Sequence, residues 1–182
     1  MQPIFSEEKE NYYSFQWDKL GNIAEGRRQL GESMPVLVYR MLEYSMRHVL
    51  HEALGADKTN ELFRKAGYLS GKEYAKNCLN LQADPGAFTA EFTEAMEALK
   101  IGIVRVEQAD FEASEFVFTV YEDLDCSGLP TTQEVVCNYD EGFLSGVLEA
   151  YLGHPVKVRE VDCWASGERV CRFRGSKEDG KD

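Results

Sequence analysis

Apolar side chains recur at helical spacing in three stretches of the first hundred residues. One stretch spans about residues 33–55, one begins at residue 57 or 59, and one runs from about 84 to 99. In the second stretch Gly67 and Gly71 are four residues apart, so they lie on one helix face and let another element approach closely. The pattern therefore predicts three helices, the second of which has a close-packing face.

From residue 101 onward the apolar pattern changes its period. Residues 101–104 and 116–121 show the alternation that is typical of strands. A further helix is expected to begin with Thr132 as its N-cap and to end at Gly153, and residues 156–173 are expected to form a hairpin. Helices followed by mostly antiparallel strands predict an α+β domain with helices packed on one face of the sheet.

The chain is short enough for one domain. Its 182 residues divide into an aromatic-rich N-terminal arm over residues 1–20, a single domain over 21–175 and a charged tail over 176–182. We expect the rings of the arm to dock on the core of the same chain or on a second subunit.

The charge of the chain limits its partners. The 32 acidic residues exceed the 20 basic ones, which gives a net charge of −12. Such a field repels nucleic acid unless a basic patch overrides it, so we expect no nucleic-acid binding by this chain itself. There is no signal-peptide pattern and no apolar run long enough to span a bilayer, which predicts a cytoplasmic protein with reduced thiols.

Common enzyme motifs are missing from the chain. It has no glycine-rich dinucleotide fingerprint, no P-loop and no G-x-S-x-G elbow. A non-enzymatic role is therefore favoured, and no catalytic residue is assigned.

Three cysteines are expected to converge on the last hairpin. Cys163 and Cys171 flank its turn, and Cys137 lies near the start of the preceding helix. Zinc prefers sulfur and nitrogen ligands and accepts one carboxylate, for which Glu160 is the nearest candidate. Residues three apart on a regular strand face opposite ways, so Glu160 and Cys163 share a metal only if a bulge lies near Val161 or Asp162.

The spacing of these cysteines leaves three interpretations open. It does not match a standard zinc-finger pattern, so a metal site competes with inert buried thiols and with a Cys163–Cys171 disulfide. The reducing compartment makes the disulfide the weakest of the three. Cys78 is expected to be a buried helix residue, and Cys126 is assigned no role.

Several short motifs carry a resemblance to a known family. They are Gly142-Phe143-Leu144-Ser145-Gly146, Tyr151-Leu152-Gly153-His154-Pro155, Arg159-Glu160-Val161-Asp162-Cys163, Gly167 and Cys171. Together they resemble the C-terminal half of 4-vinyl reductase domains, and most closely the sensory domains of bacterial activators of phenol and xylene catabolism.

This resemblance implies a fold, a metal and a quaternary state. The family fold mixes helices with a sheet, is related to a subunit of the TRAPP vesicle-tethering complex, and forms homodimers. The sensory domains bind structural zinc through an upstream cysteine and a later segment of Glu, two residues, Cys, seven residues and Cys. By resemblance the ligands here are Cys137, Glu160, Cys163 and Cys171.

The resemblance also implies an apolar pocket between the helices and the sheet. In the phenol sensors a histidine and a tryptophan hold the ligand's hydroxyl, whereas ungapped alignment of this chain places Phe88 and Phe116 there, and a gap in the loop would place Phe118 or Tyr121 instead. The expected lining residues are Phe88, Phe92, Phe116, Phe118 and Tyr121. Such a pocket, roughly 300–1,000 Å³ in volume, would suit an aromatic or hydrocarbon molecule without a phenolic group.

Three functions remain open at this point. The leading one is a stand-alone module that binds an apolar small molecule as a sensor or carrier. The others are a structural or adaptor protein of the same fold, and a reductase or helper in tetrapyrrole metabolism. A closed apolar cavity favours the first, a cavity plugged by its own side chains the second, and a polar gap beside an acid or base the third.

Overall fold

The computed structural model describes residues 14–177. The chain divides into two units, residues 1–33 and 34–182, which are described separately. The first unit contains the 3₁₀ helix η1 (Trp17–Leu20) and the short helix α2 (Ile23–Gly26). The predicted arm and tail fall partly outside the described residues, and their bounds stay predictions.

Three helices open the second unit, as the apolar spacing predicts. They are α3 (Val36–Leu54), α4 (Ala56–Cys78) and α5 (Pro85–Ala98). Gly55, with φ +80°, separates α3 from α4. The Asp84 carboxylate caps α5 by accepting the N–H groups of Gly86 and Ala87.

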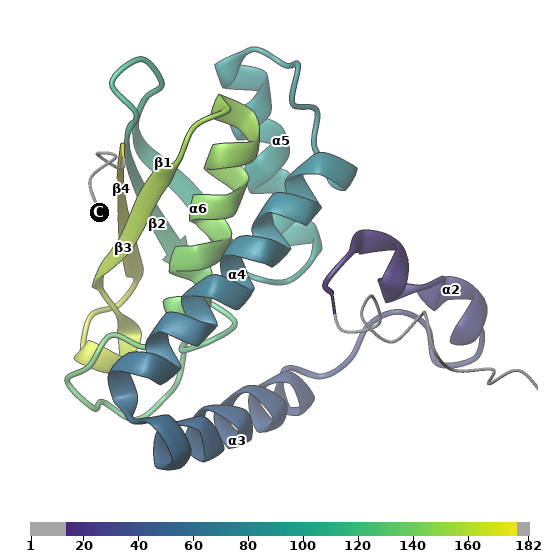
Figure 1. Ribbon diagram of the computed structural model, residues 1–182, viewed down its shortest axis with the longest axis vertical. Coiled ribbons are helices and arrows are strands. Elements are labelled where there is room, and N and C mark those ends of the chain that lie inside the picture. The colour runs from purple at the N-terminus through teal and green to yellow at the C-terminus, as the bar shows by residue number, and fades with distance from the viewer. Residues whose placement is uncertain (1–13, 178–182) are drawn as a thin grey trace, which may run out of the picture. The chain divides into compact units, whose positions relative to one another are not determined.

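Four strands form one antiparallel sheet in the order β1-β2-β4-β3. Their bounds are β1 (Ile103–Asp110), β2 (Glu115–Tyr121), β3 (Val156–Asp162) and β4 (Cys171–Lys177). The β3–β4 register shifts between Glu160 and Asp162, which confirms the bulge predicted near Val161. Helices α5 and α6 pack on one face of this sheet (Figure 1), and the predicted α+β class is confirmed.

Helix α6 (Asn138–Leu152) begins later than the sequence pattern predicts. Thr132 was expected to be its N-cap, and this is wrong. The backbone N–H groups of Thr132 and Gln133 instead donate to the carbonyl of Ala165, in the 3₁₀ turn η2 (Trp164–Ser166), at 2.8 and 3.1 Å. These bonds hold the segment as a loop against η2, and Cys137 becomes the residue that precedes the helix.

Glycine residues on both α4 and α6 allow these helices to touch along their backbones. A Cβ atom on Gly67 or Gly71 would overlap the carbonyl oxygen of Tyr139 or Phe143. A Cβ atom on Gly142 or Gly146 would likewise overlap backbone atoms of α4. The close-packing face predicted from Gly67 and Gly71 is confirmed, and its partner is α6.

The core lies between α6, α5 and the inner face of the sheet. Its largest fully buried side chains include Phe116 and Phe173 from the sheet, Met96 from α5 and Val147 from α6. Helix α4 covers α6 on the side away from the sheet (Figure 1). Within residues 14–177, none of the helices has the length and apolar character needed to cross a membrane.

The helix crossing gives a direct test of this packing. Gly71→Ala should lower the free energy of unfolding by about 1–3 kcal/mol or more, because the added methyl forces the two backbones apart. Thermal and urea unfolding measure the change. Gly26→Ala is the matched control, since a Cβ there meets nothing within 4 Å. Equal stability of the two variants would contradict the contact.

Candidate metal centre and apolar cavity

Four cysteines from four separate segments meet beside the sheet. Cys126 lies in the loop after β2, Cys137 precedes α6, Cys163 follows β3, and Cys171 begins β4. All four are at most 1% exposed. The chain therefore gathers these thiols in a closed, buried cluster.

The distances between the sulfurs suit a metal ion. The Cys137 sulfur lies 3.8 Å from those of Cys163 and Cys171, and the sulfurs of Cys126 and Cys171 are 3.1 Å apart. In a tetrahedral zinc–thiolate site with bonds of about 2.3 Å, neighbouring sulfurs lie about 3.8 Å apart. All four sulfurs lie within 4.8 Å of one another, so together they could hold a metal ion.

Glu160 approaches this cluster from its edge. Its Oε2 accepts the backbone N–H of Cys137 at 3.0 Å, while its own N–H donates to Oε1 of Glu141 at 2.9 Å. Its Oε1 is buried and has no hydrogen-bond partner among the described residues. The structure thus brings Cys137, Cys163 and Cys171 together as expected and places Glu160 next to them.

The ionisation of these groups reflects their mutual contact. Burial, followed by the neighbouring Cys163 sulfur, raises the pKa of Glu160 to about 9. Hydrogen bonding among the thiols, with Cys126 foremost, lowers the pKa of Cys163 and raises the pKa values of Cys137 and Cys171. These directions follow from the close contact of the four sulfurs. A divalent cation would take the place of the thiol protons.

Cys126 is the member of the cluster that sequence reasoning missed. It sits in a loop, 45 residues before its nearest sulfur neighbour. Knowledge of the strand pairing would have placed Cys126 near the other cysteines, because β2 and β4 are adjacent and Val120 pairs with Cys171. A loop that follows β2 at that end of the strand must pass close to Cys171. Cys78, expected to be buried, is instead exposed near the end of α4.

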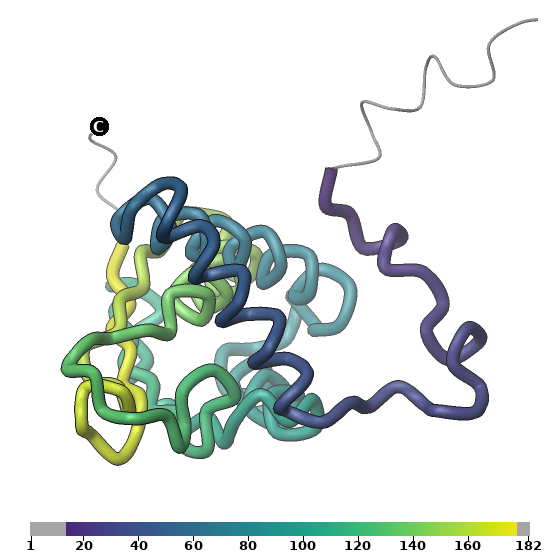
Figure 2. The backbone as a smooth tube through the Cα atoms, turned by 90° about the horizontal axis from the view of Figure 1, so that it is seen from below, coloured from purple at the N-terminus to yellow at the C-terminus, as the bar shows by residue number. Residues whose placement is uncertain are grey.

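Helix α3 is attached by hydrogen bonds to the loop that carries Cys126. Arg40 donates to the carbonyls of Leu124 and Ser127, both at 2.8 Å, and the Tyr39 hydroxyl donates to the Asp125 carboxylate at 2.7 Å. Figure 2 shows this helix running beside the loop. The position of α3 therefore depends on the conformation of the loop after β2.

The same helix also contacts the segment around Cys137. Arg47 donates to the carbonyl of Val136 at 2.9 Å and to Oδ1 of Asn138 at 3.0 Å, and it pairs with Glu43 at 3.4 Å. Glu43 is the buried residue of α3. Two of the four cysteine-bearing segments are thus tied to one helix by polar contacts.

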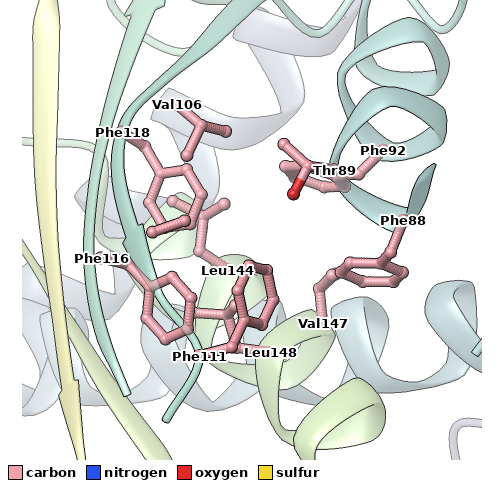
Figure 3. Close-up of a pocket in the computed structure, with 11 residues that line it drawn as sticks. Phe88, Thr89, Phe92, Val106, Phe111, Phe116, Phe118, Leu144, Val147 and Leu148 are labelled. Carbon is pink, nitrogen blue, oxygen red and sulfur yellow. The ribbon is translucent and has the colours of Figure 1, made fainter. Parts of the chain in front are cut away.

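An apolar cavity lies between α5, α6 and the β1–β2 hairpin (Figure 3). Four of the five expected residues, Phe88, Phe92, Phe116 and Phe118, line it. Tyr121 does not, because it follows Val120 on the opposite face of β2, where the Arg105 guanidinium covers its ring at 4.8 Å. The other lining residues are Thr89, Val106, Ala109, Phe111, Leu144, Val147 and Leu148.

This cavity is nearly filled by its own side chains. Its volume is about 20 Å³, which is space for about one water molecule and far below the ~300 Å³ of a typical ligand pocket. Thr89 is the one polar residue among those lining it, and its hydroxyl donates to the Pro85 carbonyl at 2.7 Å. The described form is closed, and its wall is apolar.

Comparison with known proteins identifies the type of domain. Residues 116–177 match the 4-vinyl reductase domain, which confirms the resemblance for this part of the chain. The uncharacterized protein MJ1642 of Methanocaldococcus jannaschii is 28% identical over 153 residues, which cover 84% of this chain and 84% of that protein.

Solved structures share the fold at low sequence identity. One is the phenol-responsive sensory domain of the transcription activator PoxR with phenol, with a TM-score of 0.61 and 17% identity over 95% of this chain and 92% of that one. Another is trafficking protein particle complex subunit 3 from Naegleria fowleri covalently bound to palmitic acid. Its TM-score is 0.62 at 16% identity, and the match covers 79% of this chain and 95% of that one. The fold is therefore that of 4-vinyl reductase domains and TRAPP subunits.

Proposed function

We propose that this chain, with its 4-vinyl reductase-like domain, is a binding module for a small apolar molecule, stabilised by a structural zinc ion, and that it senses or carries its ligand. The observation that carries this proposal is the cavity whose wall is almost wholly apolar, enclosed by α5, α6 and the sheet. A cavity of this kind suits a hydrocarbon or simple aromatic molecule, since it offers no free hydrogen-bond donor to a polar one.

The β1–β2 turn is the most direct route for opening the cavity. Phe111 lies in this turn, and its ring meets those of Phe116 and Tyr151 edge-on at 5.2 and 5.7 Å. It lies at the edge of the cavity and is partly exposed (Figure 3). Outward movement of the turn would free the volume of one phenyl ring at the cost of these two ring contacts, and the backbones of β2 and α6 could stay in place.

The two similar structures support a ligand-binding role. One is described with phenol and the other with palmitic acid, and both share the fold of this chain. Both ligands consist mostly of apolar carbon atoms. The absence of a histidine or tryptophan among the residues that line this cavity favours a ligand without a hydroxyl group.

The small volume of the cavity favours a second candidate function. If the phenylalanine rings that line the cavity do not move apart, no ligand can enter. The domain then works as a structural or adaptor protein whose core is complete without a ligand. About 20 Å³ of free space is the specific observation for this alternative.

The cysteine cluster supports a structural role for the metal. Cys137, Cys163 and Cys171 supply three thiolates, and Glu160 is the fourth ligand that the family pattern implies. Their burial leaves no open position for water, so the ion would cross-link three segments, the start of α6, the end of β3 and the start of β4, and would not act on a substrate. Reduced thiolates of this kind suit the cytoplasm.

Helix α3 supports assembly into a homodimer. It exposes a row of large apolar side chains, among them Val38, Leu42 and Met46, that are 50–65% exposed. This row borders an apolar groove of about 540 Å³ between α3, α4 and α6. A monomeric protein rarely leaves such a surface open, and a second copy of the chain is the occupant that we propose.

Ligand binding is tested by thermal unfolding in the presence of toluene and phenol. Toluene should stabilise the wild type by about 2.7 kcal/mol at roughly 100 times its Kd, and phenol should act more weakly. Val106→Phe, which fills the cavity, should abolish the shift, whereas Val117→Phe on the outer face of β2 should not. Absence of any shift with either molecule would favour the adaptor function.

Metal binding is tested by elemental analysis after purification without chelators. We expect one zinc per chain, and Cys163→Ser should lose the metal together with stability on the order of 10 kcal/mol, enough to prevent folding. Cys78→Ser, at an exposed position, should keep both. Less than about 0.1 zinc per chain with freely titratable thiols would refute the site.

Dimer formation is tested by light scattering at micromolar concentration. The wild type should show twice the chain mass of 20.7 kDa, and Leu42→Glu should reduce it to the monomer by placing a charge in the apolar interface. Val161→Glu, at a residue 44% exposed on β3, is the matched control and should stay dimeric. A wild-type monomer would exclude this use of the α3 face.

A further inference from the structure

We infer that Cys126, and not Glu160, is the fourth ligand of the metal, so that the site is built from four sulfurs. This inference rests on the structural metal proposed above. It departs at one position from the ligand set that the family resemblance implies, and it assigns a role to a cysteine that the sequence leaves unexplained.

The first argument is the mutual distance of the donor atoms. The sulfurs of Cys126, Cys137, Cys163 and Cys171 all lie within 4.8 Å of one another. Among residues 14–177 the oxygens of Glu160 do not join that set. A tetrahedral ion needs four donors that are all mutual neighbours, at about 3.3–3.8 Å across a site with bonds of 2.0–2.3 Å.

The second argument is that the loop presents Cys126 in a fixed conformation. The Asp123 carboxylate accepts the N–H groups of Asp125 at 2.9 Å and Cys126 at 3.2 Å, and the Asp123 carbonyl accepts that of Ser127 at 3.1 Å. Arg40 of α3 holds the outer side of the same turn. The Cys126 thiol is therefore positioned by its backbone before any ion binds, as ligands in structural sites are.

The third argument is that Glu160 has a different role. Its Oε2 accepts the N–H of Cys137, the residue before the first turn of α6. An oxygen acceptor at this position satisfies a backbone donor that has no partner within the helix. Glu160 thus orients Cys137 from outside the sulfur tetrahedron, as a supporting residue for a metal ligand.

The unpaired Oε1 of Glu160 is the strongest argument for the rival arrangement. In that arrangement Oε1 binds the ion in place of the Cys126 sulfur, which gives three sulfurs with one oxygen, while Oε2 keeps the Cys137 N–H. Cys126 would then be a buried thiol that is not bound to the ion, although its sulfur lies 3.1 Å from that of Cys171. The four-sulfur site uses all four converging thiols, which is why we favour it.

The experiment is zinc K-edge X-ray absorption on the zinc-loaded full chain. The wild type and Glu160→Gln should both show four sulfurs at about 2.3 Å, whereas Cys126→Ser should replace one of them by an oxygen at about 2.0–2.2 Å. Cys78→Ser is the control and should match the wild type. If Cys126→Ser does not fold, the wild-type and Glu160→Gln spectra still decide the question.

Two outcomes would overturn the inference, and they differ. Three sulfurs and one oxygen in the wild type, with the oxygen shell altered in Glu160→Gln and unchanged in Cys126→Ser, would establish Glu160 as the ligand and leave the structural metal standing. A wild-type protein that binds no zinc would remove both the fourth ligand and the metal proposed above.

Discussion

The backbone contact between α4 and α6 is the constraint on which the rest of the domain depends. Each helix contributes glycines to it, Gly67 and Gly71 from α4 and Gly142 and Gly146 from α6. Because no side chain separates the helices, their relative position is set by backbone atoms and tolerates little variation. The opposite side of α6 is thereby held against the sheet, and its first turn delivers Cys137 to the other cysteines.

Helix α3 is attached to the rest of the domain by polar contacts, in contrast to the close backbone packing of α4 on α6. It is held by hydrogen bonds from Tyr39, Arg40 and Arg47 to the loops that carry Cys126 and Cys137, and its apolar side chains face outward. Charge-assisted hydrogen bonds to carbonyls depend on the position of those carbonyls. An ion that fixes the two loops would therefore also fix the helix that offers the apolar surface.

Local signals predicted most of the fold, and non-local pairing accounts for what they missed. The helix periods and the glycine face are encoded within a few residues, so the sequence predicted them. The start of α6 was misplaced because Thr132 is bonded to Ala165, a contact that no local pattern reveals. Cys126 was missed for a similar reason, because its surroundings depend on which strand lies beside β2. Tyr121 is a different case, since alternation along β2 already places it on the face opposite Phe116 and Phe118.

The cysteine cluster and the cavity share α6, and this bears on which wall of the cavity has the least freedom to move. Leu144, Val147 and Leu148 form one wall of the cavity on the same helix that begins after Cys137. Because glycine contacts hold α6 against α4, this wall has little freedom to move. The opposite wall ends in the β1–β2 turn, which carries Phe111 at a partly exposed position. If the domain binds a ligand as proposed, this turn is the part of the wall that can move while the cluster end of the domain stays in place.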